Sequence, residues 1–127
     1  MQMKTHDPSA IFAPVGPYTH GLEVAEARRL LFITGTMGLD KNGKASVGID
    51  AQCAQAWRNI AAILEDAGMT MRNLVKVTCY LADRSYREAN MKARAAALGD
   101  HRVATVVVVA GLLEDDWLVE IEAVAAA

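Results

Sequence analysis

The chain has few cysteines, few prolines and few aromatic residues, and it carries no cofactor motif. Its two cysteines, Cys53 and Cys79, lie too far apart for a Cys-x-x-Cys unit, and we expect both to be reduced, buried thiols. No group of His, Cys, Asp and Glu has the spacing of metal ligands. A GxSxG motif, a P-loop and a dinucleotide fingerprint are also absent. The sequence therefore predicts neither a metal nor an organic cofactor.

Long apolar runs and an excess of basic charge are missing as well. The longest apolar run, residues 103–113, is about half of the roughly 20 residues that a membrane helix needs. The N-terminus MQMKTHDPSA has no apolar stretch of the kind found in signal peptides, so we expect a cytoplasmic protein without a membrane partner. The formal net charge is −2 and no basic stripe alternates with aromatics, which argues against nucleic acid as a partner.

What the chain does have is the composition of one globular domain. It has 127 residues, of which 53% are hydrophobic and 22% charged, and we treat residues 1–127 as a single domain. Apolar periodicity and turn residues predict an α+β fold of order ββαβαββ. We expect strands at residues 21–24, 30–34, 74–81, 101–112 and 117–125, and helices at 50–67 and 86–98.

Several local signals set these boundaries. The first two strands are close enough to form an antiparallel hairpin with a tight polar turn. Asp50 is placed to cap the first helix and Gly68 to end it. The second helix follows the Ser-x-x-Glu pattern of a capping box, Ser85 to Glu88, and ends at Gly99.

The fourth strand contains four consecutive valines, Val106 to Val109, and so has no polar side. Because successive side chains point to opposite faces of a sheet, both faces of this strand need burial. Two helices can cover only one face of a mixed sheet. We therefore expect the second face to pack against other copies of the chain in a closed homo-oligomer.

The first candidate functional residue is Tyr18, in the segment FAPVGPYTHG at residues 12–21. Pro14, Gly16 and Pro17 make a rigid entry to the first strand, which would hold the tyrosine hydroxyl at a defined point. The alternative is a tyrosine that only anchors the turn. His20, two residues later, is interpreted as a packing or hydrogen-bonding residue.

The last strand supplies two carboxylates, Glu120 and Glu122, on one face of an otherwise apolar segment. Neighbouring carboxylates beside apolar walls are an arrangement that supports general acid–base catalysis. The alternative is a solvated outer face, which the pattern favours for Glu122, with a basic residue as its partner. For Glu120 the residues alone leave both interpretations open.

Several segments together resemble the reactive-intermediate deaminase family, also called RidA or YjgF-like and, under an older label, endoribonuclease L-PSP. The matching pieces are GPYTHG (16–21), ITGTMGLD (33–40), Gln52, VKVTCYLAD (75–83), Asn90 and VEIEAVA (119–125). The resemblance implies a chorismate-mutase-like fold and a homotrimer with a small-molecule cleft between each pair of subunits. It also implies hydrolysis of reactive enamines and imines to keto acids and ammonia, without metal or organic cofactor.

The same resemblance implies a set of site residues. Tyr18 corresponds to the site tyrosine of the family, Thr34 and Gly35 to a hydroxyl and backbone contact, Asn90 to an amide lining the cleft, and Glu120 to the carboxylate that orients water. Such a set fits a hydrolytic deaminase, which must place water against the imine carbon and stabilise developing charge with fixed donors.

The chain departs from the family at one position. The deaminases carry an arginine in the fourth strand that holds the substrate carboxylate. Its place here falls on Ala104 if one residue is inserted near Glu114, and on Thr105 otherwise. Arg102 lies two residues earlier on the same face as Ala104 and is a second candidate for the carboxylate.

The missing arginine puts amino-acid-derived substrates in doubt and leaves three functions to compare. A nearby cysteine that many family members carry is also replaced, by Val106 or Val107, so this cleft is more apolar. The first function is a hydrolase of imine-like or related C–N compounds that lack a carboxylate, using Glu120 and Tyr18. The second is a binding or sensing trimer without catalysis. The third, RNA cleavage or translation inhibition, is disfavoured by the acidic charge balance.

Overall fold

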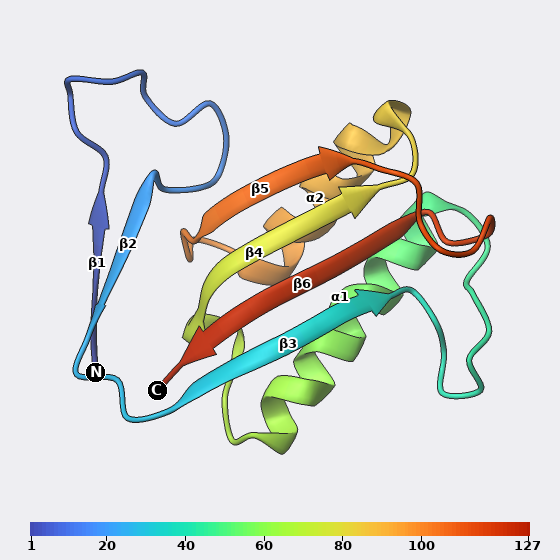
Figure 1. Cartoon of the computed structure of the whole chain (residues 1–127), viewed down its shortest axis with the longest axis horizontal. Helices are drawn as coiled ribbons and strands as arrows, with labels where there is room; N and C mark the ends of the chain where they lie inside the picture. The colour runs from blue at the N-terminus through green and yellow to red at the C-terminus, as the bar shows by residue number, and fades with distance from the viewer.

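The computed structural model describes all residues from 1 to 127, and it contains six strands and two long helices (Figure 1). The strands are β1 (Gln2–His6), β2 (Gly21–Ala25), β3 (Leu30–Met37), β4 (Leu74–Leu81), β5 (Ala104–Val109) and β6 (Val119–Ala126). The helices are α1 (Ile49–Asp66) and α2 (Arg87–Leu98), with short 3₁₀ turns η1 (Met71–Asn73) and η2 (Arg84–Tyr86).

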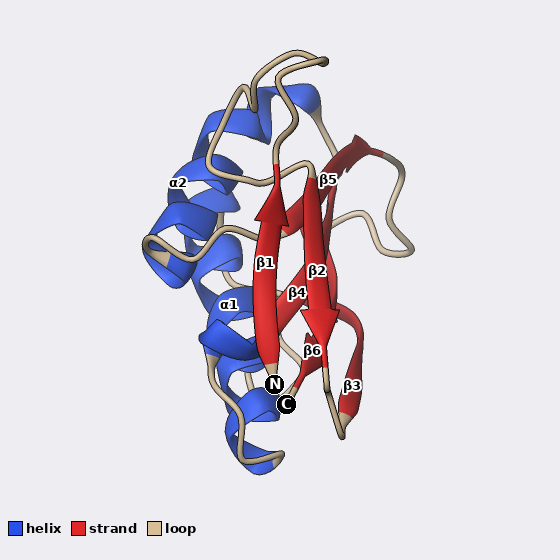
Figure 2. Cartoon of the chain, turned by 90° about the vertical axis from the view of Figure 1, so that its left-hand side faces the viewer, coloured by secondary structure: helices blue, strands red, loops and turns tan.

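Four of the strands form a mixed sheet in the order β3-β6-β4-β5. β6 runs antiparallel to both of its neighbours, whereas β4 and β5 are parallel and are joined through α2. Both helices lie against one face of this sheet, and the other face is uncovered (Figure 2). The predicted α+β architecture, a mixed sheet with two helices on one face, is confirmed.

The predicted hairpin between the first two strands is wrong. β2 pairs with β1, a strand that the sequence analysis missed, and these two form a separate two-stranded sheet. β3 pairs instead with β6. The residues between β2 and β3 turn toward the C-terminus, where the backbone N–H groups of Arg28 and Arg29 both donate to the carbonyl of Ala127. This contact starts the β3–β6 ladder, and the strand order becomes βββαβαββ.

Both helices have the predicted bounds to within one residue, but their N-terminal caps differ from the prediction. Gly68 and Gly99 follow α1 and α2 with φ values of 69° and 59°, a left-handed conformation that glycine adopts without strain. Asp50 lies in the first turn of α1 and makes no side-chain cap. The capping box at Ser85 does not form, because Asp83 accepts the backbone N–H of Ser85 and caps η2 instead.

The core lies between the helices and the covered face of the sheet. Alternate residues of β4 and β6 point into it, including Val77, Cys79, Val119 and Ile121, all fully buried. Cys53 and Cys79 are buried free thiols, as predicted. Burial raises the pKa of the Cys53 thiol to about 11. Neither helix is long and apolar enough to cross a bilayer.

Candidate functional site

The predicted site residues divide into two groups on different surfaces of the chain. Tyr18 and Asn90 line a cavity of about 510 Å³ between the N-terminal loop, α2 and β5, which we call the Tyr18 cavity. Thr34, Gly35 and Glu120 lie on β3 and β6, where their neighbours form the uncovered face of the sheet. One chain therefore does not bring the whole predicted site together.

The loop that carries Tyr18 is held by a network of hydrogen bonds. Asp7 accepts the backbone N–H of His20 (2.7 Å) and the hydroxyl of Thr19 (2.9 Å). The bond from the His20 backbone is the main reason why the pKa of Asp7 lies below its usual value. The His20 ring donates from Nε2 to the carbonyl of Phe12 (2.7 Å) and stacks edge-on against Phe12 and Tyr18. His20 thus acts as the packing residue that the sequence predicts.

The hydroxyl of Tyr18 also has a local role. The backbone N–H of Val15 donates to its oxygen (3.2 Å), which closes the turn. Because a phenol has one hydrogen to donate as well, the Tyr18 O–H remains free for a ligand. The two interpretations of Tyr18, turn anchor and site residue, are therefore compatible.

One face of α2 supplies polar groups to the Tyr18 cavity. Arg87, Asn90, Met91 and Arg94 recur three or four residues apart and all line it, together with Arg84 of η2. Asn90 and Arg94 are buried, at 1% and 5% exposure, whereas Arg84 and Arg87 are exposed. No aspartate or glutamate lines this cavity. Its electrostatic character is therefore cationic.

Glu120 lies directly over Gly35 of the neighbouring strand. The β3–β6 register shifts between Ile33 and Thr36, so the chain bulges at Thr34 and Gly35. A Cβ atom at Gly35 would be 2.4 Å from Oε1 of Glu120. The absence of a side chain at Gly35 is thus what allows the carboxylate to lie across the bulge.

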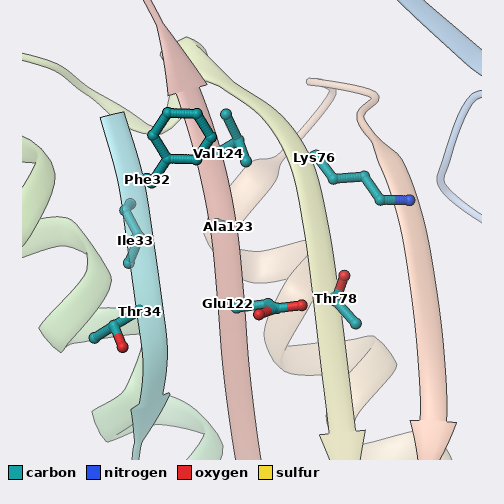
Figure 3. Close-up of a pocket in the computed structure, with 8 residues that line it drawn as sticks. All are labelled: Phe32, Ile33, Thr34, Lys76, Thr78, Glu122, Ala123 and Val124. Carbon is teal, nitrogen blue, oxygen red and sulfur yellow. The ribbon is translucent and has the colours of Figure 1, made fainter. Parts of the chain in front are cut away.

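Glu122 shares the uncovered face with Glu120 but has a different partner. The hydroxyl of Tyr80 donates to Glu122 Oε1 (2.9 Å), and this bond is the largest cause of a raised pKa of Tyr80. Figure 3 shows Glu122 reaching from β6 toward Thr78 of β4 in a hollow of about 410 Å³ that also contains Lys76. A basic partner was expected, and the hydrogen-bond partner is a tyrosine.

The three positions considered for a carboxylate anchor lie on β5 or just before it and point in different directions. Thr105 lines the Tyr18 cavity. Ala104 is paired with Lys76 and does not line that cavity. Arg102 is exposed, donates from Nη1 to the carbonyl of Gly99 (3.1 Å) and borders a hollow beside β1. The strand registers place Ala104 on the same uncovered face as Glu120, whereas Thr105 lies on the opposite face. Each of the two alignments therefore stays a prediction, and Arg102 is directed away from both positions.

The valine segment lies at the edge of the sheet. Val107 and Val109 face the Tyr18 cavity, as expected from the alternation of side chains along a strand. All four valines are 37–48% exposed in the single chain. Phe32 and Leu30, on β3, are also exposed, at 74% and 60%. Apolar surface thus flanks both groups of predicted site residues.

Sequence reasoning missed the residues that give the Tyr18 cavity its charge. Arg94 was placed in the second helix and was not considered further. The signal was present, because Asn90, Arg94 and Leu98 recur every four residues and so share the buried face of α2. Asp7 was missed because the first strand was missed. No three or more His, Cys, Asp or Glu side chains cluster closely enough to hold a metal ion.

The chain is similar in sequence to proteins of one known family. The family model described as endoribonuclease L-PSP matches residues 8–127. A RutC family protein of Pyrococcus horikoshii is 38% identical over 114 residues, which is 88% of each chain. A mouse protein named 2-iminobutanoate/2-iminopropanoate deaminase is 33% identical over 97 residues, 66% of this chain and 70% of the relative.

A solved structure with the same fold extends the likeness to the full length. The Yersinia pestis protein YyfB, described as a protein of unknown function of the conserved Rid protein family, superposes with a TM-score of 0.87 at 25% identity and covers 100% of both chains. The chorismate-mutase-like fold implied by the sequence is thus supported by structure as well as by sequence. The chain belongs to the endoribonuclease L-PSP family, that is, the RidA/YjgF family.

Proposed function

We propose that this protein is a homotrimeric hydrolase of small imines or enamines, with its active sites in clefts between subunits. The observation that carries the proposal is the division of the candidate residues between two surfaces of one chain. Tyr18 and Asn90 line a cavity beside β5, and Glu120 lies over Gly35 on the uncovered side of the sheet. Packing of one copy's uncovered sheet face against another copy's β5 edge would join the two groups.

The exposed apolar surface supports this assembly. Val106, Val108 and Phe32 are 37–74% exposed in the single chain, at the borders of the two groups. Large exposed apolar surface of this kind marks protein–protein contacts in soluble proteins. Burial of both sides of β5 is what its sequence requires.

The chemistry follows from the two groups acting together. Hydrolysis of an imine needs a water placed against the C=N carbon, a proton for the departing nitrogen and donors for developing charge. Glu120 is the group that orients and deprotonates the water. The Tyr18 O–H and the Asn90 amide are the donors on the opposite wall. The bulge at Gly35 offers backbone groups beside the carboxylate.

Two relatives with printed deaminase names, from mouse and human, support the reaction class. The substrates in those names, 2-iminobutanoate and 2-iminopropanoate, both carry a carboxylate. Ala104 or Thr105 stands where the family's deaminases carry the carboxylate-binding arginine, and neither side chain can replace a bidentate guanidinium. If the β5 position is the only group that binds the substrate carboxylate, we expect slow turnover of these two substrates.

A second function, a binding or sensing trimer without catalysis, is favoured by the walls of the same cavity. Val107 and Val109 line it and make this wall apolar. The resemblance to the family places a cysteine of many members at Val106 or Val107. The two functions differ in turnover, which only the hydrolase would show. RNA cleavage has no support from the charge of the chain, which is −2.

The test is an imine-hydrolysis assay on two matched variants. We expect the wild-type protein to release keto acid from an imine generated in situ by an amino-acid oxidase faster than the uncatalysed reaction. Glu120→Gln should lower this rate about 100-fold or more with little change in Tm, because it removes the base. Glu122→Gln keeps an acceptor for the Tyr80 hydroxyl but removes the charge that strengthens this bond, and it should change Tm more than the rate. Equal activity of wild type and Glu120→Gln would refute the hydrolase and favour the binding or sensing trimer.

A further inference from the structure

Arg94 is a buried cation whose hydrogen-bonding groups are not satisfied within the chain. It is 5% exposed and lies on the face of α2 that points to the sheet. Its Nε and Nη1 atoms have no hydrogen-bond partner, and neither has Oδ1 of the adjacent Asn90. Buried guanidinium groups are normally paired, because an uncompensated buried charge is costly. This arginine also lines the Tyr18 cavity.

No group of the chain acts as the counter-charge. The two ion pairs of the chain, His6–Glu23 and Arg72–Asp100, both lie elsewhere. Cys79 lies close to Arg94, but burial raises the pKa of its thiol, and the positive charge of Arg94 only partly opposes this rise. The thiol is therefore neutral near pH 7. The cavity adds two further cations, Arg84 and Arg87, and no acid.

We infer that Arg94, assisted by Arg84 and Arg87, holds the carboxylate of the substrate in the Tyr18 cavity. The inference rests on the proposed function for the identity of the reacting group and adds the group that is recognised. A planar guanidinium with free Nε–H and Nη–H donors can bind a carboxylate in bidentate fashion. The anchor then comes from α2, and the threonine at position 105 of β5 need not supply it.

The other walls of the cavity define the rest of the ligand. Leu81, Met91, Val107 and Val109 offer apolar contact, which suits a short alkyl chain better than a polar one. A volume of about 510 Å³ holds a molecule of this size. The cavity therefore favours a small carboxylate with an aliphatic side chain, and the proposed function adds its imine group.

The alternative partner of Arg94 is a carboxylate of a neighbouring copy of the chain, which would form a structural ion pair with it. The two cases differ in the effect of removing the charge. If Arg94 waits for a ligand, Arg94→Met removes an unpaired buried charge, and Tm should stay the same or rise. If Arg94 pairs with another copy, the same change leaves a buried carboxylate alone, and both Tm and assembly should suffer.

The experiment measures binding, so that it does not depend on turnover. The probe is 2-oxobutanoate, the keto acid that corresponds to the printed substrate of two relatives. Its methyl ester has nearly the same shape and no charge. Titration calorimetry on the intact protein compares wild type with Arg94→Met, Arg94→Lys and the control Arg58→Met. Arg58 is exposed on α1 and does not line the Tyr18 cavity. Its Nη2 donates to Oε1 of Gln55 (2.7 Å).

We expect wild type and Arg58→Met to bind the keto acid and not the ester. Arg94→Met should bind it about 10- to 100-fold more weakly, and Arg94→Lys should lie between, since it keeps the charge and loses the fork. The inference would be overturned if Arg94→Met bound the keto acid as tightly as wild type does, or if wild type bound the ester equally well. It would also be overturned if wild type did not bind the keto acid or preferred inorganic phosphate. Loss of folding or assembly in Arg94→Met would overturn it as well. Binding without imine turnover would refute the proposed hydrolase and leave the anchor standing.

Discussion

The close contact between Gly35 and Glu120 allows a sharp test of the catalytic assignment without touching the carboxylate itself. In Gly35→Ala the new Cβ would lie 2.4 Å from Oε1 and 2.9 Å from Cδ of Glu120. Ordinary van der Waals contact begins near 3.4 Å, so the carboxylate must move by about 1 Å. A displacement of that size can cost about 100-fold in rate when the group must meet a reacting atom.

The cost to stability should be small, since the atoms in the way belong to the end of a flexible side chain. A glycine-to-alanine change also stabilises by about 0.4–1 kcal/mol through the unfolded chain where the backbone is compatible. We therefore expect a net change within about 1 kcal/mol, or roughly 4 °C in Tm for a chain of this size. Imine hydrolysis and a thermal melt on the same preparation measure the two effects.

Two other glycines serve as controls. Gly111→Ala meets no atom within 4 Å and should change neither rate nor Tm. Gly38→Ala would place its Cβ 2.4 Å from the backbone oxygen of Gln52, so α1 itself must shift, and Tm should fall sharply. Full activity of Gly35→Ala would mean that the position of Glu120 does not matter to the reaction. A large loss of Tm in that variant would mean that the side chain cannot yield.

Three further outcomes are expected. Sedimentation at micromolar concentration should give a trimer for wild type, and a wild-type monomer would contradict the proposed assembly. Val108→Asp should abolish assembly or folding, because it places a charge on the sheet face that we expect to be covered. Ala104→Arg should raise 2-iminobutanoate turnover if the family arginine aligns with Ala104, and Thr105→Arg should do so if it aligns with Thr105; gain in neither variant would contradict the missing anchor on β5. Burial raises the pKa of the Cys53 thiol from 9.0 to about 11, so the stability that the protonated thiol contributes is complete below about pH 9 and is lost as the pH rises through 11. Denaturant melts of Cys53→Ala should lack this part of the loss of stability at alkaline pH.

The elements that the sequence predicts best are those with a strong internal pattern. The recurrence of apolar residues at three and four positions located α1, and alternation located β6, to within a few residues. β-branched and aromatic content located β4, and flanking Ser85 and Gly99 located α2. The hairpin prediction failed for a different reason. Strand propensity does not identify a partner, and β2 and β3 each pair with a strand from one end of the chain. The polar segment of β1, QMKTH, carries little strand signal of its own.

The candidate site was predictable as a set of residues and not as an arrangement. The resemblance to the family identified Tyr18, Asn90 and Glu120, but nothing in their spacing shows that they lie on two surfaces of one chain. The role of Gly35 needed the strand register, because the contact with Glu120 arises at a bulge. Arg94 was readable as part of a helix face. Its lack of a partner is a property of the folded chain alone.

The division of the candidate residues between two surfaces has a genetic consequence. A chain with Tyr18→Phe keeps an intact Glu120 surface, and a chain with Glu120→Gln keeps an intact Tyr18 cavity. In the proposed homotrimer, random assembly of two such chains in equal amounts would give both intact halves to about a quarter of the clefts between subunits. Two defective alleles expressed in one cell would then complement each other, whereas either allele alone would be null.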